Sequence, residues 1–164
     1  MSSFFKKLFR AHEETGVKAE WLFHYEDVDT GKKWTLGPYK NKVVQGGLDN
    51  QAALLVGEVP STTAAMHCVI GSNSAAAATM DTISTMTEVA RGDITAKSRS
   101  GAMARLRTFF GTSEANGDHN CVGLVARSTD TAGSGVLLNR LVQAFSKTSS
   151  MVLTVEVRVT FTGV

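Results

Sequence analysis

The last segment of the chain has the most restrictive pattern in the sequence. Hydrophobic and polar side chains alternate without interruption from residue 153 to residue 162, and Met151 continues the hydrophobic face. Only a β-strand places every second side chain on one face. The residues predicted to face a core are Met151, Leu153, Val155, Val157, Val159 and Phe161, and those predicted to face outward are Thr154, Glu156, Arg158, Thr160 and Thr162. A strand of this kind needs a second layer to cover its apolar face.

The same two-residue period occurs in other parts of the chain. Residues 19–27 and 33–39 flank an Asp29-Thr30-Gly31 turn, which predicts a hairpin in which Trp21 and Trp34 pair. Further strands are predicted at 43–44, 64–71, 88–96, 102–110, 121–126 and 136–145. Short strands separated by Gly, Ser, Thr and Asn turns are typical of antiparallel sandwiches. The sequence therefore predicts a mainly β chain with an antiparallel β-sandwich or jelly-roll-like domain.

Two segments have helical spacing instead. Phe4, Phe5, Leu8 and Phe9 follow the i, i+3, i+4 pattern and form one apolar stripe, which predicts a short N-terminal amphipathic helix. A short internal helix is predicted at 48–56, before Gly57 and Pro60. We interpret residues 1–16 as an N-terminal arm and residues 17–164 as the β-sandwich domain.

Composition narrows the class of protein. The chain has 164 residues, of which 43% are hydrophobic and 20% charged, so it is expected to fold around a core rather than remain disordered. No apolar run reaches the roughly 18 residues that span a bilayer, so no membrane span is expected. The N-terminal segment is not expected to be a secretory signal, because it lacks a long apolar region. The net charge of +2 is too small to indicate a nucleic-acid partner.

The sequence contains no known motif for catalysis, for a cofactor or for a metal ion. Patterns for a nucleophile elbow, a P-loop, a zinc protease or paired cysteine ligands do not occur in the sequence. His67-Cys68 and His119-Asn120-Cys121 would make a metal site conceivable if their strands paired. Adjacent strand residues point to opposite faces, however, and a free Cys usually behaves as a small buried hydrophobe. We therefore expect no enzyme, no cofactor and no metal ligand.

Two groups of residues are candidates for contacts with other molecules. Arg91, Arg99, Arg105 and Arg107 lie in a basic stretch, which reads as a phosphate or acidic-partner surface, as a solvated face of two strands, or as a charged contact between subunits. The Phe4, Phe5, Leu8 and Phe9 stripe is too apolar to stay in water. It is expected to fold back on its own domain or to dock on a neighbouring subunit, with a membrane surface as a third alternative. All eight residues are predicted interface residues.

The order of short motifs resembles a family of small bacteriophage virion proteins. The resemblance covers about residues 19–162. It rests on Asn41-Lys42-Val43-Val44-Gln45-Gly46-Gly47-Leu48, Ala52–Gly57, Ile70-Gly71, Asp81-Thr82, Glu88-Val89-Ala90-Arg91, Glu114-Ala115-Asn116-Gly117, Gly135-Val136-Leu137-Leu138-Asn139-Arg140 and Ser146-Lys147-Thr148. In the Gly123-Leu124-Val125 strand the family pattern has Phe at the third position, and it has Glu where this chain has Cys121.

The resemblance implies a structural protein of the phage particle, made in the cytoplasm of the host bacterium. It implies a non-catalytic subunit that forms a symmetric homo-oligomer in the tail, baseplate or neck, with other tail, baseplate or portal-adaptor components as partners. The alternatives are a jelly-roll module that binds a host glycan and a capsid decoration protein.

Overall fold

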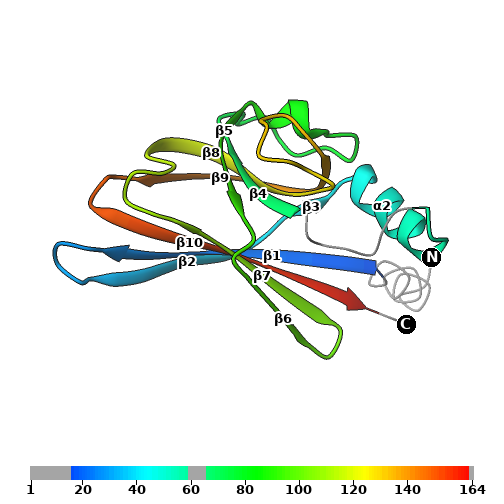
Figure 1. The fold of residues 1–164 in the computed structure, drawn as a ribbon, viewed down its shortest axis with the longest axis horizontal. Helices are drawn as coiled ribbons and strands as arrows, with labels where there is room; N and C mark the ends of the chain where they lie inside the picture. The colour runs from blue at the N-terminus through cyan, green and yellow to red at the C-terminus, as the bar shows by residue number, and fades with distance from the viewer. Residues whose placement is uncertain (1–15, 59–65, 163–164) are drawn as a thin grey trace, which may run out of the picture.

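The computed structural model describes residues 16–58 and 66–162, and they form a mainly β structure with two antiparallel sheets (Figure 1). Each sheet has five strands. Sheet A has, in spatial order, β2 (Lys33–Lys40), β1 (Gly16–Asp27), β10 (Met151–Thr162), β7 (Met103–Phe110) and β6 (Ala96–Ser100). Sheet B has β3 (Lys42–Val43), β9 (Val136–Lys147), β8 (Gly117–Ala126), β4 (Met66–Gly71) and β5 (Glu88–Asp93).

The main core lies between the two sheets, which gives the molecule a sandwich-like arrangement. Sheet A contributes alternate residues of β1 and β10, among them Phe23 and Val155, and sheet B contributes residues such as Ile70 and Phe145. Phe23 and Phe145 meet across this core with ring centroids 4.6 Å apart. Of the residues predicted to face the core in the last strand, Leu153, Val155 and Val157 are buried. Phe161, near the end of the strand, is 48% exposed, so the prediction is wrong there.

The first and last strands form the centre of sheet A. β1 pairs with β10 over its whole length, from Gly16 opposite Thr162 to Asp27 opposite Met151. The predicted hairpin between β1 and β2 is present, but the tryptophans do not pair across it. Trp21 lies opposite Tyr39, and Trp34 stacks on Tyr25 at a centroid distance of 5.1 Å. The position of the turn at residues 28–30 already places Trp34 opposite Tyr25, so the tryptophans cannot pair. The register shift between Trp21 and Phe23 lies farther along β1 and sets only the partner of Trp21.

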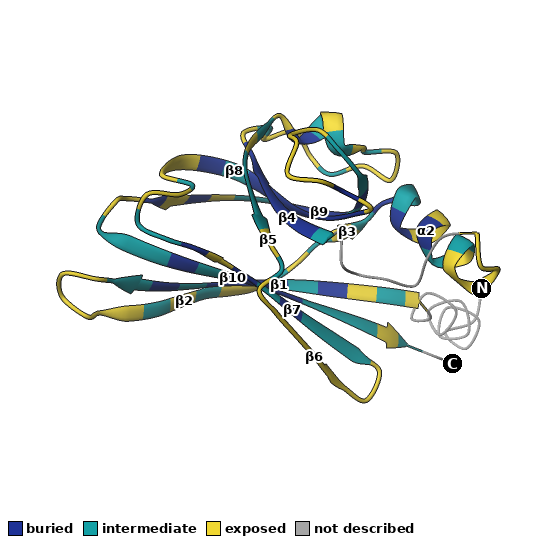
Figure 2. Ribbon diagram, viewed as in Figure 1, coloured by how far each residue is buried: buried dark blue, intermediate teal, exposed yellow. Residues whose placement is uncertain are grey.

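Sheet B is covered on its second face as well. Val69, Met86, Cys121 and Val125 belong to a smaller core on the side of the sheet away from sheet A. Met86 comes from η2 (Ile83–Met86), a short 3-10 helix within the long 72–87 connection. This second layer explains why β4 and β8 contain unbroken runs of buried residues instead of an alternating pattern (Figure 2).

The internal helix, α2 (Gln45–Leu55), begins three residues before the predicted start and ends one residue before the predicted end. It packs against β9 through its first turns. Gly47 permits this close contact, because a Cβ at that position would collide with the carbonyl oxygen of Leu138.

Residues 88–100 form two strands where one was predicted at 88–96. β5 ends at Asp93 in sheet B, and β6 begins at Ala96 in sheet A. β6 is exposed along its whole length and forms the edge of sheet A beside β7 (Figure 2). The alternation of small and polar residues in this segment does not show where the chain changes sheets.

The predicted N-terminal helix falls on residues outside the described part of the chain, and so do residues 64–65 of the strand predicted at 64–71. Gly16, the last residue of the predicted arm, is the first residue of β1. None of the helices in the described residues is both long enough and apolar enough to cross a membrane.

Candidate functional site

The predicted basic interface residues do not form a single surface. Arg105 and Arg107 lie on β7 and point to the outer face of sheet A. Arg99 lies opposite Ala104 in the β6–β7 pair, so its side chain starts on the other face of the sheet. Arg91 lies on β5 in sheet B. The four arginines are close in sequence, but strand alternation and the change of sheet between β5 and β6 separate them. Phe4, Phe5, Leu8 and Phe9 lie outside the described residues.

Arg105 and Arg107 surround a carboxylate that has no exposed surface. The Glu156 side chain is on the outer face of β10 yet is 0% exposed, because long side chains cover it. Arg107 and Arg158 each donate from Nε to Glu156, at 2.5 and 2.6 Å, and Arg105 Nε lies 3.4 Å away. Burial alone would raise the pKa of Glu156, but the hydrogen bonds and charges of the arginines outweigh it and hold that pKa below its ordinary value.

Arg91 forms its hydrogen bonds with other residues of the same chain. It forms two hydrogen bonds with Glu88, from Nε at 2.6 Å and from a terminal nitrogen at 2.8 Å. It also donates to the Thr129 carbonyl oxygen and to Ser134 in the β8–β9 loop, while the Gly133 amide donates to Glu88 at 2.8 Å. Burial would raise the pKa of Glu88, but these contacts lower it. The pair therefore fixes the β8–β9 loop against β5.

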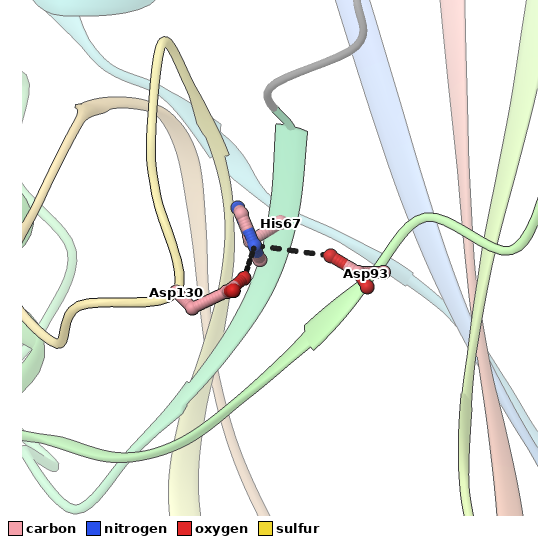
Figure 3. Close-up of side chains that lie close together, drawn as sticks. All are labelled: His67, Asp93 and Asp130. Carbon is pink, nitrogen blue, oxygen red and sulfur yellow. Dashed lines mark hydrogen bonds and ion pairs between the residues drawn. The ribbon is translucent and has the colours of Figure 1, made fainter.

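That loop brings Asp130 to a buried histidine (Figure 3). His67 Nε2, on β4, lies 3.1 Å from Asp93 Oδ1 at the end of β5 and 3.2 Å from Asp130 Oδ1. The His67 side chain is 6% exposed, whereas those of Asp93 and Asp130 are 78% and 98% exposed. One imidazole nitrogen and two carboxylate oxygens therefore meet at the surface, with all three atoms within 4.8 Å of one another.

The other ring nitrogen of His67 has its own partner. His67 Nδ1 lies 2.7 Å from the hydroxyl oxygen of Ser128, which is buried. A serine, a histidine and an aspartate in contact form the arrangement of a nucleophilic relay. Here the serine is enclosed and is bonded to Nδ1, so its hydroxyl orients the ring and does not present a nucleophile to solvent. The three charged or ionisable groups at the surface remain available to bind a cation.

The sequence predicts cysteine, and not aspartate, as the partner of His67 in a conceivable metal site. Cys68 is in the main core and Cys121 in the smaller core, and His119 packs against Phe145 with ring centroids 5.1 Å apart. Asp93 and Asp130 are not among the residues that the sequence predicts for a site. No local signal marks them, because they are 26 and 63 residues away from His67 in the sequence. Strand pairing places Asp93 opposite His67, and the anchored loop supplies Asp130.

A third feature is an apolar surface at the end of α2. Leu55 is 88% exposed and the following Val56 is 69% exposed, and Leu48 and Leu54 of the same helix are also exposed. The described residues do not cover these side chains. Val17, near the start of β1, lines a small hollow together with Gly47 and Asn50 of α2, so the chain enters β1 beside this helix.

Comparison with known proteins adds no relative to this description. No protein-family model, no curated protein and no solved structure matches the chain.

Proposed function

We propose that this chain is a structural subunit of a bacteriophage particle, made in the cytoplasm of the host bacterium. It assembles as a symmetric oligomer in the tail, baseplate or neck region, together with other virion proteins, and does no catalysis. The motif order of residues 19–162 supports this proposal, as does the mainly β architecture with two layers. For the finer topology we propose a jelly-roll relationship. In a nested arrangement, β1 pairs with β10 in one sheet, and β3 pairs with β9 in the other. This arrangement favours the jelly-roll relationship, whereas the pairing of the consecutive strands β8 and β9 in one sheet departs from it.

The observation that carries the proposal is the exposed apolar end of α2. Leu55 and Val56 would each lose a large apolar surface from water on contact with a partner. The 15 residues that precede β1 include the Phe4, Phe5, Leu8 and Phe9 stripe. Val17, near the start of β1, lies beside α2. An arm of 15 residues can extend about 50 Å, which is enough to reach a neighbouring subunit. We assign the arm of one subunit to the apolar end of α2 on the next.

The first experiment measures oligomer size. Analytical ultracentrifugation of the full chain is expected to show an oligomer. Deletion of residues 1–15 and the double substitution Leu55→Ser with Val56→Ser are each expected to dissociate it. Val28→Ser is the matched control, because Val28 is also an exposed apolar residue but lies in the β1–β2 turn, far along β1 from α2. A wild-type chain that remains monomeric at high concentration would contradict the assembly proposal.

The second experiment tests location. Immunogold labelling of purified phage particles is expected to mark the tail, baseplate or neck. Labelling over the head would favour the capsid decoration alternative. Particles without the protein would overturn the virion assignment altogether.

One observation favours the glycan-binding alternative. A hollow of about 330 Å³ lies beside β1, β2, β7 and β10, and the side chains that line it include Trp34, Phe109, His24, Glu26 and Lys33. Aromatic rings next to polar and charged groups are the means by which shallow sites hold sugars. Glycan-array binding that is lost in Phe109→Ser and retained in Leu55→Ser would support this alternative.

A further inference from the structure

We propose that His67, Asp93 and Asp130 bind one divalent transition-metal cation, with Zn²⁺ as the best match, and that the cation fastens the β8–β9 loop to the edge of sheet B. The proposal is independent of the assembly role above. It rests on the positions of three ligand atoms, on the fixed orientation of the His67 ring, and on the anchoring of the β8–β9 loop.

The ligand atoms are spaced as a metal ion requires. Zinc bonds to nitrogen and oxygen of about 2.0–2.2 Å place the corners of a tetrahedron about 3.3–3.6 Å apart. His67 Nε2 lies 3.1 and 3.2 Å from the two carboxylate oxygens, and these oxygens are within 4.8 Å of each other. Small rotations of the exposed Asp93 and Asp130 side chains therefore complete three corners, and the fourth faces solvent. One imidazole and two carboxylates suit Zn²⁺ better than Ca²⁺ or Mg²⁺, which prefer oxygen ligands alone.

The histidine ring is oriented by its second nitrogen. When Nδ1 carries the proton and donates it to Ser128 Oγ at 2.7 Å, the lone pair of Nε2 points to the two carboxylates. Metal-bound histidines in proteins are oriented in this way by a partner on the other nitrogen. Ser128 is buried, so this partner is fixed by packing.

Without a cation, the negative charges and hydrogen-bond acceptors of the two aspartates are not fully matched by His67. A protonated Nε2 has a single N–H, which cannot point at both carboxylate oxygens, and the two carboxylates repel each other. Ion pairs to carboxylates as exposed as these contribute little to folding, about 0–1 kcal/mol. The loop that carries Asp130 is nevertheless held in place, because Arg91 and Glu88 anchor it at Thr129, Gly133 and Ser134. A divalent ion would neutralise both carboxylates and join β4, β5 and the β8–β9 loop.

Titration of the chelator-treated full chain with Zn²⁺ in a calorimeter tests the proposal. One ion per chain is expected, with a rise in the thermal unfolding midpoint. Asp93→Asn and Asp130→Asn are each expected to weaken zinc binding at least tenfold, on the order of what loss of supporting groups costs a metal site. Both side chains are exposed, so these variants are expected to fold. Asp118→Asn, another exposed aspartate, is the matched control and is expected to bind zinc as the wild type does.

Two spectroscopic readouts identify the ligand and the effect on the loop. Nitrogen NMR of the imidazole is expected to show a zinc-dependent shift of His67 Nε2 while Nδ1 keeps its proton. Amide exchange in residues 128–134 is expected to slow when zinc is added. Three results would overturn the proposal: no zinc-dependent stabilisation of the wild type, equal zinc affinity in the wild type and Asp130→Asn, or an Nε2 that stays protonated at saturating zinc.

Discussion

Arg107 and Glu156 lie directly opposite each other on β7 and β10, and Arg107 Nε donates a hydrogen bond of 2.5 Å to Glu156 Oε2. Arg158, two residues along β10 on the same face, donates to the other carboxylate oxygen. One buried carboxylate thus holds arginines of two neighbouring strands on the outer face of sheet A. Arginine side chains on this basic surface therefore contribute to the stability of sheet A itself.

Glu156→Gln is therefore expected to destabilise the protein. The substitution keeps the size of the side chain but leaves Arg107 and Arg158 without a charged acceptor, at a cost of about 1–3 kcal/mol. Urea unfolding followed by circular dichroism measures the loss. Glu58→Gln, at an exposed position after α2, serves as the control and is expected to leave the unfolding midpoint unchanged. Equal stability of both variants would show that the arginines find other partners.

The stability of the protein is expected to fall in acid. Burial alone would raise the pKa of Glu156 and of Glu88, but the arginine hydrogen bonds outweigh it, so both pKa values are lowered from 4.5 in the folded state. A lowered folded-state pKa gives stability that is complete above the unfolded-state pKa and is lost as the pH falls through the folded-state pKa. The free energy of unfolding is therefore expected to decrease below about pH 4.5.

The Glu156→Gln variant provides the check on this pH dependence. Its free energy of unfolding is expected to fall less steeply in acid, by at most about 1.4 kcal/mol per pH unit for one proton. Parallel curves for the wild type and the variant would contradict the assignment of a lowered pKa to Glu156. Urea unfolding at a series of pH values between 3 and 6, about the range where carboxyl groups titrate, supplies the data.

Gly71→Ala is expected to weaken the contact between β4 and η2. A Cβ at Gly71 would collide with the Met86 carbonyl oxygen and lie 2.9 Å from Cys121 Sγ, inside the smaller core. Both neighbours are packed, so the strain is expected to cost about 1–3 kcal/mol. At Gly111 a Cβ would lie 3.3 Å from the flexible end of Glu114 and at an ordinary contact distance of 3.9 Å from Phe109, so Gly111→Ala is the control with little expected effect. Thermal unfolding of the two variants distinguishes them.

The two cysteines are expected to be unreactive in the folded protein. Cys68 and Cys121 are buried free thiols, and burial raises the pKa of each thiol, so little thiolate is present at neutral pH. A chromogenic disulfide reagent is expected to react with both only when urea unfolds the chain. Immediate reaction of either thiol in native buffer would show that its core opens readily.

Much of the strand pattern was predictable from the residues alone. The last strand, the β1–β2 hairpin and β7 have clear alternation because one face is buried and the other is not. The internal helix was also predicted, with small errors at its ends. β6 was missed, since its five exposed residues carry no hydrophobic period.

The candidate metal site could not be predicted from patterns of neighbouring residues in the sequence. His67 was noticed only for its neighbour Cys68, which faces the core, and the two aspartates had no motif to mark them. Their meeting depends on the pairing of β4 with β5 and on a loop held by Arg91 and Glu88.

By itself, the sequence determined that this chain builds antiparallel strands around a core, because side-chain alternation is a property of neighbouring residues. Only the tertiary structure decided which charges meet. It divided Arg91, Arg99, Arg105 and Arg107 between two sheets and two faces, buried Glu156 on an outer face, and brought His67, Asp93 and Asp130 together. The physical reason is that such contacts follow from strand order, register and loop anchoring, which depend on interactions between residues far apart in the chain.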